Sequence, residues 1–159
     1  MTKVSVFLKA IIAMSMLICG SQVMSKNMMM IEDGWIPTAP PTMKMNAGYF
    51  KLVNHGHHQQ ILVSASSPNY KNIEFHTSEM TDGMVSMKKI EQVIIGSHQA
   101  VHFKPGGLHL MMHKPVSPAL EGEVIKINLV FDGGATQEIE LQVRKRQAQM
   151  KMQGHGHHH

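Results

Sequence analysis

Short β-type runs separated by turn-forming residues constrain the fold of this chain more than any other feature. From Tyr49 onward, these runs alternate with clusters of Gly, Pro, Asn, Asp and Ser. Their spacing of roughly 8–12 residues is typical of a β-sandwich or barrel, and no segment shows a convincing helical period. The sequence therefore predicts an all-β sandwich with strands at residues 49–53, 60–65, 73–80, 84–95, 100–103, 109–112, 124–131 and 137–143.

The length of the chain fits one such domain. Of its 159 residues, about 135 remain after the N-terminal segment, which is one domain's worth and enough to bury a core without disulfides. Aromatic residues make up 5% of the chain and charged residues 16%. That composition excludes a coiled coil and a charged disordered chain. We expect the folded domain to span residues 26–146.

The first 25 residues have the pattern of a cleavable signal peptide. Lys3 and Lys9 precede an apolar run at residues 10–19, and small residues follow this run, as in secretory signals. Cleavage after Ser21 and cleavage after Ser25 both fit the sequence. A buried N-terminal helix is the alternative. We expect the protein to be exported to the periplasm.

Neither a stable membrane anchor nor nucleic-acid binding is expected. The apolar run is much shorter than the roughly 20 residues that cross a bilayer, and Ile18 stands before Cys19, where lipid attachment needs a small residue. Without Lys3 and Lys9, the 15 basic residues become 13 against 11 acidic ones, a net charge of +2. Residues 144–146 are then the remaining basic cluster, too small for nucleic-acid recognition.

Methionine and histidine are unusually abundant, whereas cysteine is nearly absent. The chain has 16 Met and 12 His, and its single Cys, Cys19, lies inside the predicted signal peptide. The mature protein is therefore expected to lack thiols. This excludes disulfides, zinc–cysteine sites, thiol redox motifs and the thiolate ligand of a blue-copper site.

Four residues have a spacing that brings imidazoles and thioethers together. His109 and Met111 are two apart on a predicted strand, so their side chains leave the same face. His76 and Met87 flank Asp82-Gly83, a strong hairpin sequence. If this turn has two residues, Met87 pairs with the residue two positions after His76 and shares its face. A three-residue loop would reverse this relationship.

Imidazole combined with thioether favours copper(I) over other biological metals. Thioether sulfur is soft and neutral, which matches a soft monovalent ion and suits magnesium, calcium or manganese poorly. Zinc prefers imidazole, thiolate or carboxylate. Taken singly, each Met could fill a gap in the core and each His could be a hydrogen-bonded surface residue. Taken together, the four residues predict a Cu(I) site.

The same four residues resemble a known signature. Ten residues separate His76 from Met87, 21 separate Met87 from His109, and one separates His109 from Met111. This H-x10-M-x21-H-x-M pattern is similar to that of periplasmic copper chaperones of the PCuAC type. Further similarity lies at Trp35-Ile36, Ala47-Gly48-Tyr49-Phe50, Ala65-Ser66-Ser67-Pro68, Glu74-Phe75 and Lys104-Pro105-Gly106-Gly107-Leu108.

The resemblance implies both a fold and a function. It implies a cupredoxin-like Greek-key β-sandwich that binds one Cu(I) through the four side chains. It also implies delivery of copper to the dinuclear copper centre of cytochrome c oxidase, with subunit II of the oxidase, a Sco-type protein or both as partners.

The other Met and His residues are assigned less specific roles. Met112 should point away from Met111 into the core or rim. Packing in the core or a loop is favoured over a site role for Met43 and Met45, and His113 is a candidate for the mouth of the site. We expect solvated positions for His98, His102 and the turn cluster His55, His57 and His58, although such clusters bind divalent copper opportunistically.

Residues 147–159 lack a β pattern and are predicted to form a flexible tail. The tail mixes thioethers with a His-rich end, and we expect it to form an accessory site for Cu(II). A purification tag is the alternative. The Met28-Met29-Met30 run is a weaker candidate for the same accessory role. The proposed tail ligands are Met150, Met152, His155, His157, His158 and His159.

Two other function classes compete with a chaperone. An enzyme is not expected, because the chain shows no recognisable Ser-His-acid triad or paired carboxylates, and neither predicted cleavage exposes the N-terminal His of a His-brace oxygenase. A copper buffer or detoxification protein would use the same ligands without a dedicated acceptor. The sequence alone leaves chaperone and buffer open.

Overall fold

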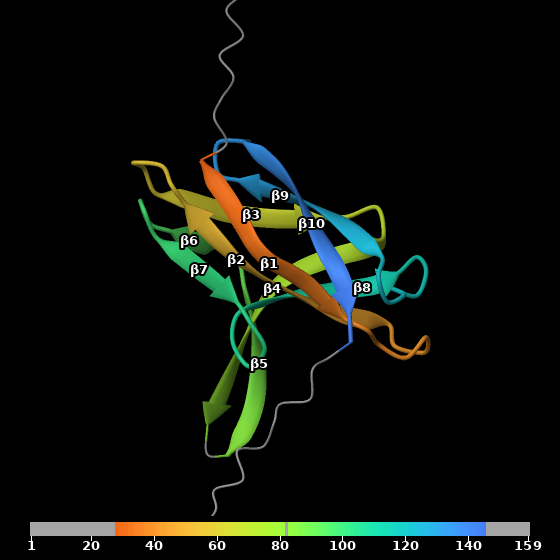
Figure 1. Ribbon diagram of the computed structural model, residues 1–159. Helices are drawn as coiled ribbons and strands as arrows, with labels where there is room; N and C mark the ends of the chain where they lie inside the picture. The colour runs from red at the N-terminus through yellow and green to blue at the C-terminus, as the bar shows by residue number, and fades with distance from the viewer. Residues whose placement is uncertain (1–27, 82, 146–159) are drawn as a thin grey trace, which may run out of the picture.

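The computed structural model describes residues 28–81 and 83–145, and these form ten β-strands and no helix (Figure 1). The all-β prediction is confirmed. No helix in this part of the chain is long and apolar enough to span a membrane. The strands are β1 Met29–Pro37, β2 Met45–Asn54, β3 Gln60–Ser66, β4 Tyr70–Thr81, β5 Met84–Ile90, β6 Val93–Ile95, β7 Ala100–Phe103, β8 His109–Pro115, β9 Val124–Phe131 and β10 Thr136–Arg144.

The strands form two layers that share β2. One layer has the order β5-β4-β8-β2, and the other continues from β2 through β1, β10, β9, β3 and β6. The first half of β2 pairs with β8 at Met45–Gly48, and its second half pairs with β7 at Phe50–Val53. All of these pairings are antiparallel except β1 with β10. The sheet therefore passes through β2 from one layer of the sandwich to the other (Figure 1).

A single apolar core lies between the layers. Alternate residues point inward in strands such as β8, β9 and β10, as the two-residue period of a strand requires. The layer that contains β8 contributes Phe75, Leu110 and Met112, and the other layer contributes Leu62 and Leu129, all of them buried. Because the inner faces are taken by apolar side chains, polar and thioether groups of the β4–β5–β8 layer are left on its outer face.

Strand β1 was not predicted from the sequence. Its pairing with β2 shifts register between Glu32 and Trp35, and Asp33 between them has a positive φ of 52°. This bulge breaks the alternation of apolar and polar residues that identifies a strand. Met29 is buried in the core, whereas Met28 and Met30 are exposed.

The single strand predicted at residues 84–95 is wrong. The segment forms two strands, β5 and β6, which pair with β4 and β3 respectively in different layers. The exposed residues Glu91 and Gln92 carry the chain between the layers. Because this connection contains neither Gly nor Pro, the pattern of turn residues does not mark it.

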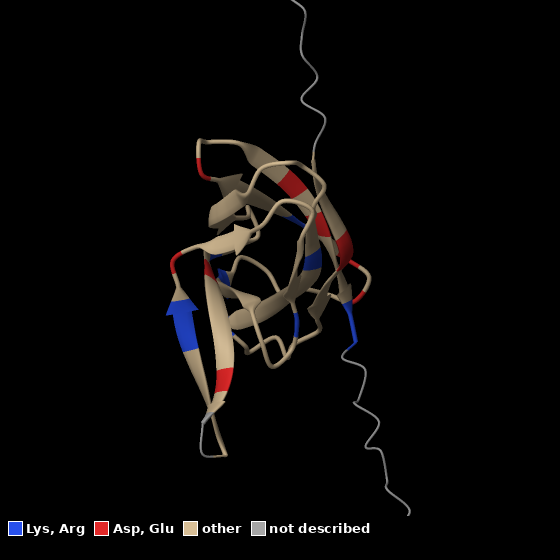
Figure 2. Cartoon of the chain, turned by 90° about the vertical axis from the view of Figure 1, so that its left-hand side faces the viewer, with Lys and Arg blue, Asp and Glu red and all other residues tan. Residues whose placement is uncertain are grey.

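Part of the β4–β5 hairpin projects beyond the sandwich (Figure 1). Met80, Met84, Val85 and Met87 are exposed on this hairpin, and both of its strands also carry charged residues (Figure 2). The predicted signal peptide at residues 1–25 and the predicted tail at residues 147–159 lie outside the described residues.

Candidate metal centre

Two of the four predicted ligands lie opposite each other on neighbouring strands. Antiparallel pairing of β4 with β8 aligns His76 with His109, so both side chains leave the same face of the sheet. The centroids of their rings are 6.0 Å apart. Strand pairing thus brings together two imidazoles that are far apart in the sequence.

The β4–β5 turn places Met87 on the same face as His76. Thr81 pairs with Met84, so the turn has two residues, and Gly83 adopts the positive φ of 77° that such turns favour. Met87 therefore pairs with Ser78, two residues beyond His76. The expected register of this hairpin is confirmed.

A hollow of about 220 Å³ lies over this face. Met87, His109 and Met111 line it, and His76 stands on the adjoining strand opposite His109. His109 is only 4% exposed, whereas Met87 is 60% exposed. The site thus has a buried imidazole at its base and a solvent-accessible thioether at its edge. The remaining lining residues are Pro37, Thr38, Ala39, Met43, Met45, Asn46, Ala47, Tyr49, Ser78 and Gly106.

The hydrogen bonds of the two imidazoles leave one ring nitrogen free on each. His109 Nδ1 lies 2.9 Å from the carbonyl oxygen of Gly107, which can only accept, so Nδ1 carries the proton and Nε2 has the lone pair. His76 Nε2 lies 3.0 Å from the Glu74 carboxylate. His76 Nδ1 is buried and makes no hydrogen bond within the described residues. The nitrogens available to a metal are therefore His76 Nδ1 and His109 Nε2.

Glu74 is an ionised carboxylate that fixes the orientation of His76. The hydrogen bond from His76, supported by Asn72 and Lys89, lowers the pKa of Glu74 to about 2 against the opposing effect of burial. The Lys89 ammonium lies 3.4 Å from its other oxygen. An anion at this position makes His76 Nε2 the donor, an arrangement that recurs where His binds metal in proteins.

His113 joins the same cluster from β8. Its Nε2 lies 3.4 Å from a Glu74 oxygen and makes no hydrogen bond within the described residues. Potential ligand atoms of Glu74, His76 and His113 all lie within 4.8 Å of one another. Glu74 and His113 therefore place an oxygen and a nitrogen donor beside His76, one of the four predicted ligands.

The preference for a packing role at Met43 and Met45 is wrong. The two side chains are 49% and 42% exposed, and both line the hollow. Met45 pairs with His113 and so lies on the outer face of the sheet. Their i, i+2 spacing ahead of the β2 core residues is the sequence signal that could have assigned them to the site.

Other expectations for Met and His residues are confirmed. Met112 is fully buried in the core, on the opposite face from Met111. His98 and His102 are exposed, as is the turn cluster His55, His57 and His58.

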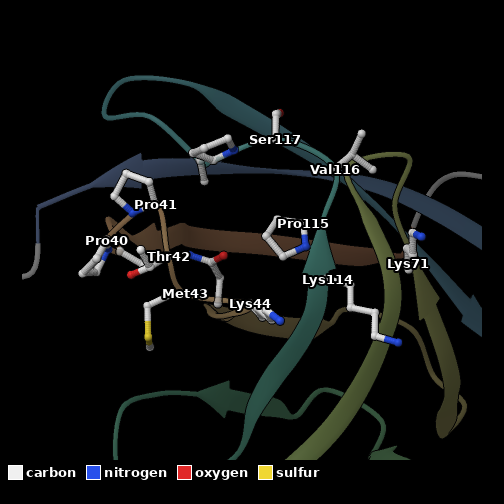
Figure 3. Close-up of a pocket in the computed structure, with 14 residues that line it drawn as sticks. Pro40, Pro41, Thr42, Met43, Lys44, Lys71, Lys114, Pro115, Val116 and Ser117 are labelled. Carbon is white, nitrogen blue, oxygen red and sulfur yellow. The ribbon is translucent and has the colours of Figure 1, made fainter.

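A second hollow adjoins the first and shares Met43 with it. It measures about 570 Å³ and is lined by prolines, including Pro40, Pro41 and Pro115, and by lysines. In Figure 3 the thioether of Met43 extends away from Pro40 and Pro41. The lining of this larger hollow contains neither His nor acidic residues, so it lacks the imidazole donors of the candidate metal centre.

Two known proteins are similar to this chain in sequence. The chain is 29% identical over 114 residues to "Uncharacterized protein RP573" of Rickettsia prowazekii, covering 67% of this chain and 63% of that protein. It is 25% identical to "Putative lipoprotein Lxx21020" of Leifsonia xyli over 71% of this chain and 68% of that protein. The matched region thus spans less than two thirds of the Rickettsia relative.

Two solved structures show the same fold. The copper-bound PCuAC domain from PmoF2 superposes with a TM-score of 0.63 at 18% identity, covering 75% of this chain and 94% of that domain. The Cu(I)-bound protein DR1885 from Deinococcus radiodurans gives a TM-score of 0.59 at 23% identity, covering 80% and 84%. The protein therefore has the cupredoxin-like β-sandwich of PCuAC domains.

The family model described as "Putative lipoprotein LpqE-like" matches residues 29–143, which run from the start of β1 almost to the end of β10. This match includes both layers of the sandwich and all four predicted copper ligands. The chain belongs to the LpqE-like family.

Proposed function

We propose that this protein is a periplasmic copper(I) chaperone whose metal is bound by His76, Met87, His109 and Met111. The observation that carries the proposal is the pairing of two imidazoles, each with one free ring nitrogen, on the outer face of a sheet that also presents two thioethers. The printed titles of the similar folds, a copper-bound PCuAC domain and a Cu(I)-bound protein, support copper as the cargo.

The donor set suits monovalent copper. Two neutral nitrogens and two neutral sulfurs bind a soft ion without adding negative charge. Glu74 contributes its charge through His76 rather than through the hollow, because its oxygen is engaged with His76 Nε2. Cu(I) bound in this way keeps a net positive charge and stays exchangeable with incoming ligands.

Exposure of one ligand provides a route for copper to leave. Met87 lies on the projecting hairpin, where Met84 and Val85 are also exposed. An acceptor that contacts this exposed part of the hairpin would reach the metal from the side of Met87 and displace that thioether first. We propose that the acceptor is the dinuclear copper centre of cytochrome c oxidase, reached through subunit II directly or through a Sco-type protein.

Export to the periplasm is supported from two directions. The N-terminal residues have the pattern of a signal peptide, and the family and the Leifsonia relative carry the description of lipoproteins, which are exported. We propose cleavage after Ser21 or Ser25, because Ile18 does not suit lipid attachment at Cys19. Mass spectrometry of the mature N-terminus distinguishes these cleavage sites from a lipidated cysteine.

A copper buffer without a dedicated acceptor is the competing function, because it would use the same ligands. The distinguishing measurement is the rate at which copper-loaded protein metallates apo subunit II, compared with free copper at the same activity. A chaperone transfers copper faster than the free ion. A buffer transfers it at the rate of free copper or more slowly.

We also propose an accessory Cu(II) site in the tail, formed by Met150, Met152 and the histidines at 155 and 157–159. Imidazole suits the harder divalent ion. Truncation after Gln149 is expected to remove a Cu(II) signal in electron paramagnetic resonance and to leave Cu(I) binding intact. Loss of both would make the tail part of the primary site.

A further inference from the structure

Hydrogen bonds connect two turns at the end of β2 that lies away from the candidate metal centre. Asn54 is completely buried. Its side-chain amide donates to the carbonyl oxygens of His58, Ile95 and Gly96 at 2.8, 3.3 and 3.0 Å, and its oxygen accepts from the Gly56 amide at 2.9 Å. One buried side chain therefore joins the turn after β2 to the turn after β6.

The second turn is fixed further by the Gly56 carbonyl. This oxygen accepts from Ser97 Oγ at 3.0 Å and from the His98 amide at 3.3 Å. His98 has a positive φ of 55°, a left-handed conformation that is uncommon outside glycine, although His adopts it more often than most residues. Such a conformation persists only where its surroundings impose it. Here they orient the His98 side chain toward the first turn.

The result is a close pair of imidazoles from different turns. His98 Nε2 lies 3.1 Å from His57 Nδ1, and the ring centroids are 4.8 Å apart with the planes at 75°. Both side chains are exposed, so water could satisfy either nitrogen equally well. A hydrogen bond between exposed rings adds little stability and does not by itself explain why the backbone is constrained on both sides.

The separation of these nitrogens matches that of two ligands on one metal ion. Imidazole nitrogens bind at about 2.0–2.1 Å, so two of them at an angle of 90–110° lie roughly 2.9–3.4 Å apart. We propose that His57 and His98 form a divalent-metal site that binds Cu(II). His55 and His58 flank His57 in the sequence of the same turn, and the two proposed ligands are His57 and His98 alone.

Copper is the preferred occupant because of ligand type. Imidazole donors bind several divalent metals, and affinity rises to a maximum at Cu(II) in the first-row series. The site is separate from the thioether hollow, since Ala47 and Asn54 are seven residues apart on one strand, or about 23 Å. It therefore does not depend on the proposed Cu(I) site.

The test is a Cu(II) titration of the full-length protein followed by electron paramagnetic resonance. The parent carries Gln in place of the four tail histidines His155, His157, His158 and His159, so that the tail does not bind. Two variants remove the proposed ligands, His57→Gln and His98→Asn, the latter because Asn also tolerates a positive φ. The matched control is His102→Gln, which removes an exposed His elsewhere.

We expect His57→Gln and His98→Asn each to lose one equivalent of nitrogen-coordinated Cu(II), or to bind it at least tenfold more weakly than the parent. His102→Gln should match the parent. The proposal is overturned if both variants keep the parent's stoichiometry and affinity, or if His102→Gln loses as much. Metal-free melting curves check folding, and His57→Gln decides if His98→Asn is unfolded. All variants retain the four primary ligands, so failure of the Cu(I) proposal would not alter the comparison.

Discussion

Met111 and Met112 are sequence neighbours in opposite environments. Met111 lines the hollow over the outer face of the sheet, and Met112 is completely buried in the core. The period of the strand alone separates these roles, since successive side chains leave opposite faces. Two chemically identical side chains can therefore be tested against each other within one strand.

We predict that Met111→Leu weakens Cu(I) binding more than tenfold and that Met112→Leu does not. Leucine has a similar volume but no sulfur, so it removes a ligand from the hollow while costing the core less than about 1.5 kcal/mol. Competition with a Cu(I) chelator measures affinity, and urea unfolding measures stability. Equal affinity of the two variants would remove Met111 from the ligand set.

Glu74 should matter to copper through the orientation of His76. Replacing it by Gln removes the anion that makes His76 Nε2 a donor. We predict that Glu74→Gln lowers Cu(I) affinity by roughly 10–100-fold, as is usual for partners of metal-bound His. The matched control is Glu79→Gln, an exposed position on the same strand. If both variants bind as tightly as wild type, Glu74 does not position His76.

Glu74 should also contribute stability that depends on pH. Its pKa is lowered from 4.5 to about 2 by the hydrogen bond with His76. A lowered carboxyl pKa stabilises the folded state fully above the unfolded value, and this contribution is lost as the pH falls through the folded value. The advantage of metal-free wild type over Glu74→Gln should therefore shrink between pH 4.5 and 2.

Melting temperatures of both proteins across this pH range provide the measurement. A constant difference between wild type and Glu74→Gln would show that the ion pair adds nothing to stability.

At the scale of the elements, the β4–β5 hairpin determines which side chains face the proposed copper site. Its two-residue turn places Met87 opposite Ser78, and its neighbour Ser86 faces away. Because both positions are exposed, side chains can be exchanged there without disturbing the core.

Exchanging the two residues, Ser86→Met with Met87→Ser, keeps the composition and moves the thioether to the wrong face of the sheet. We predict that Cu(I) affinity falls as far as in Met87→Leu while the melting temperature is unchanged. The control exchanges Met84 and Val85, which lie nearer the turn. Undiminished affinity after the first exchange would mean that Met87 is not a ligand.

The sequence predicts local geometry here better than long-range pairing. Asp82-Gly83 specifies a tight turn, so the faces of His76 and Met87 follow from counting residues. The direct pairing of His76 with His109 does not follow from counting, because β4 and β8 are joined by a long connection through other strands. The four candidate ligands could be identified from the sequence. Only the structure shows which ring nitrogen of His76 and of His109 is free to bind a metal.

Irregular backbone explains why two strand boundaries cannot be recognised from the sequence pattern. The bulge at Asp33 concealed β1, and the polar Glu91-Gln92 connection concealed the break between β5 and β6. Met43 reaches the hollow from the β1–β2 connection, and Met45 does so through the pairing of β2 with β8. The path of that connection is set by tertiary contacts rather than by local residue preferences.

At the scale of the whole molecule, the sandwich separates its stability from its proposed metal chemistry. Apolar side chains fill the space between the layers, and the thioethers of Met87 and Met111 stand outside it. Ligand substitutions should therefore test copper binding without unfolding the domain. The proposed Cu(II) site at His57 and His98 lies at the other end of β2, so the two sites should load independently.

The most direct measurement of the central claim is X-ray absorption spectroscopy of the Cu(I)-loaded protein at one copper per chain. We predict a copper environment with both nitrogen and sulfur neighbours. The sulfur contribution should disappear in the double variant Met87→Leu with Met111→Leu, which should remain folded and bind Cu(I) much more weakly. A copper environment without sulfur in the wild type, or sulfur retained in the double variant, would contradict the proposed site.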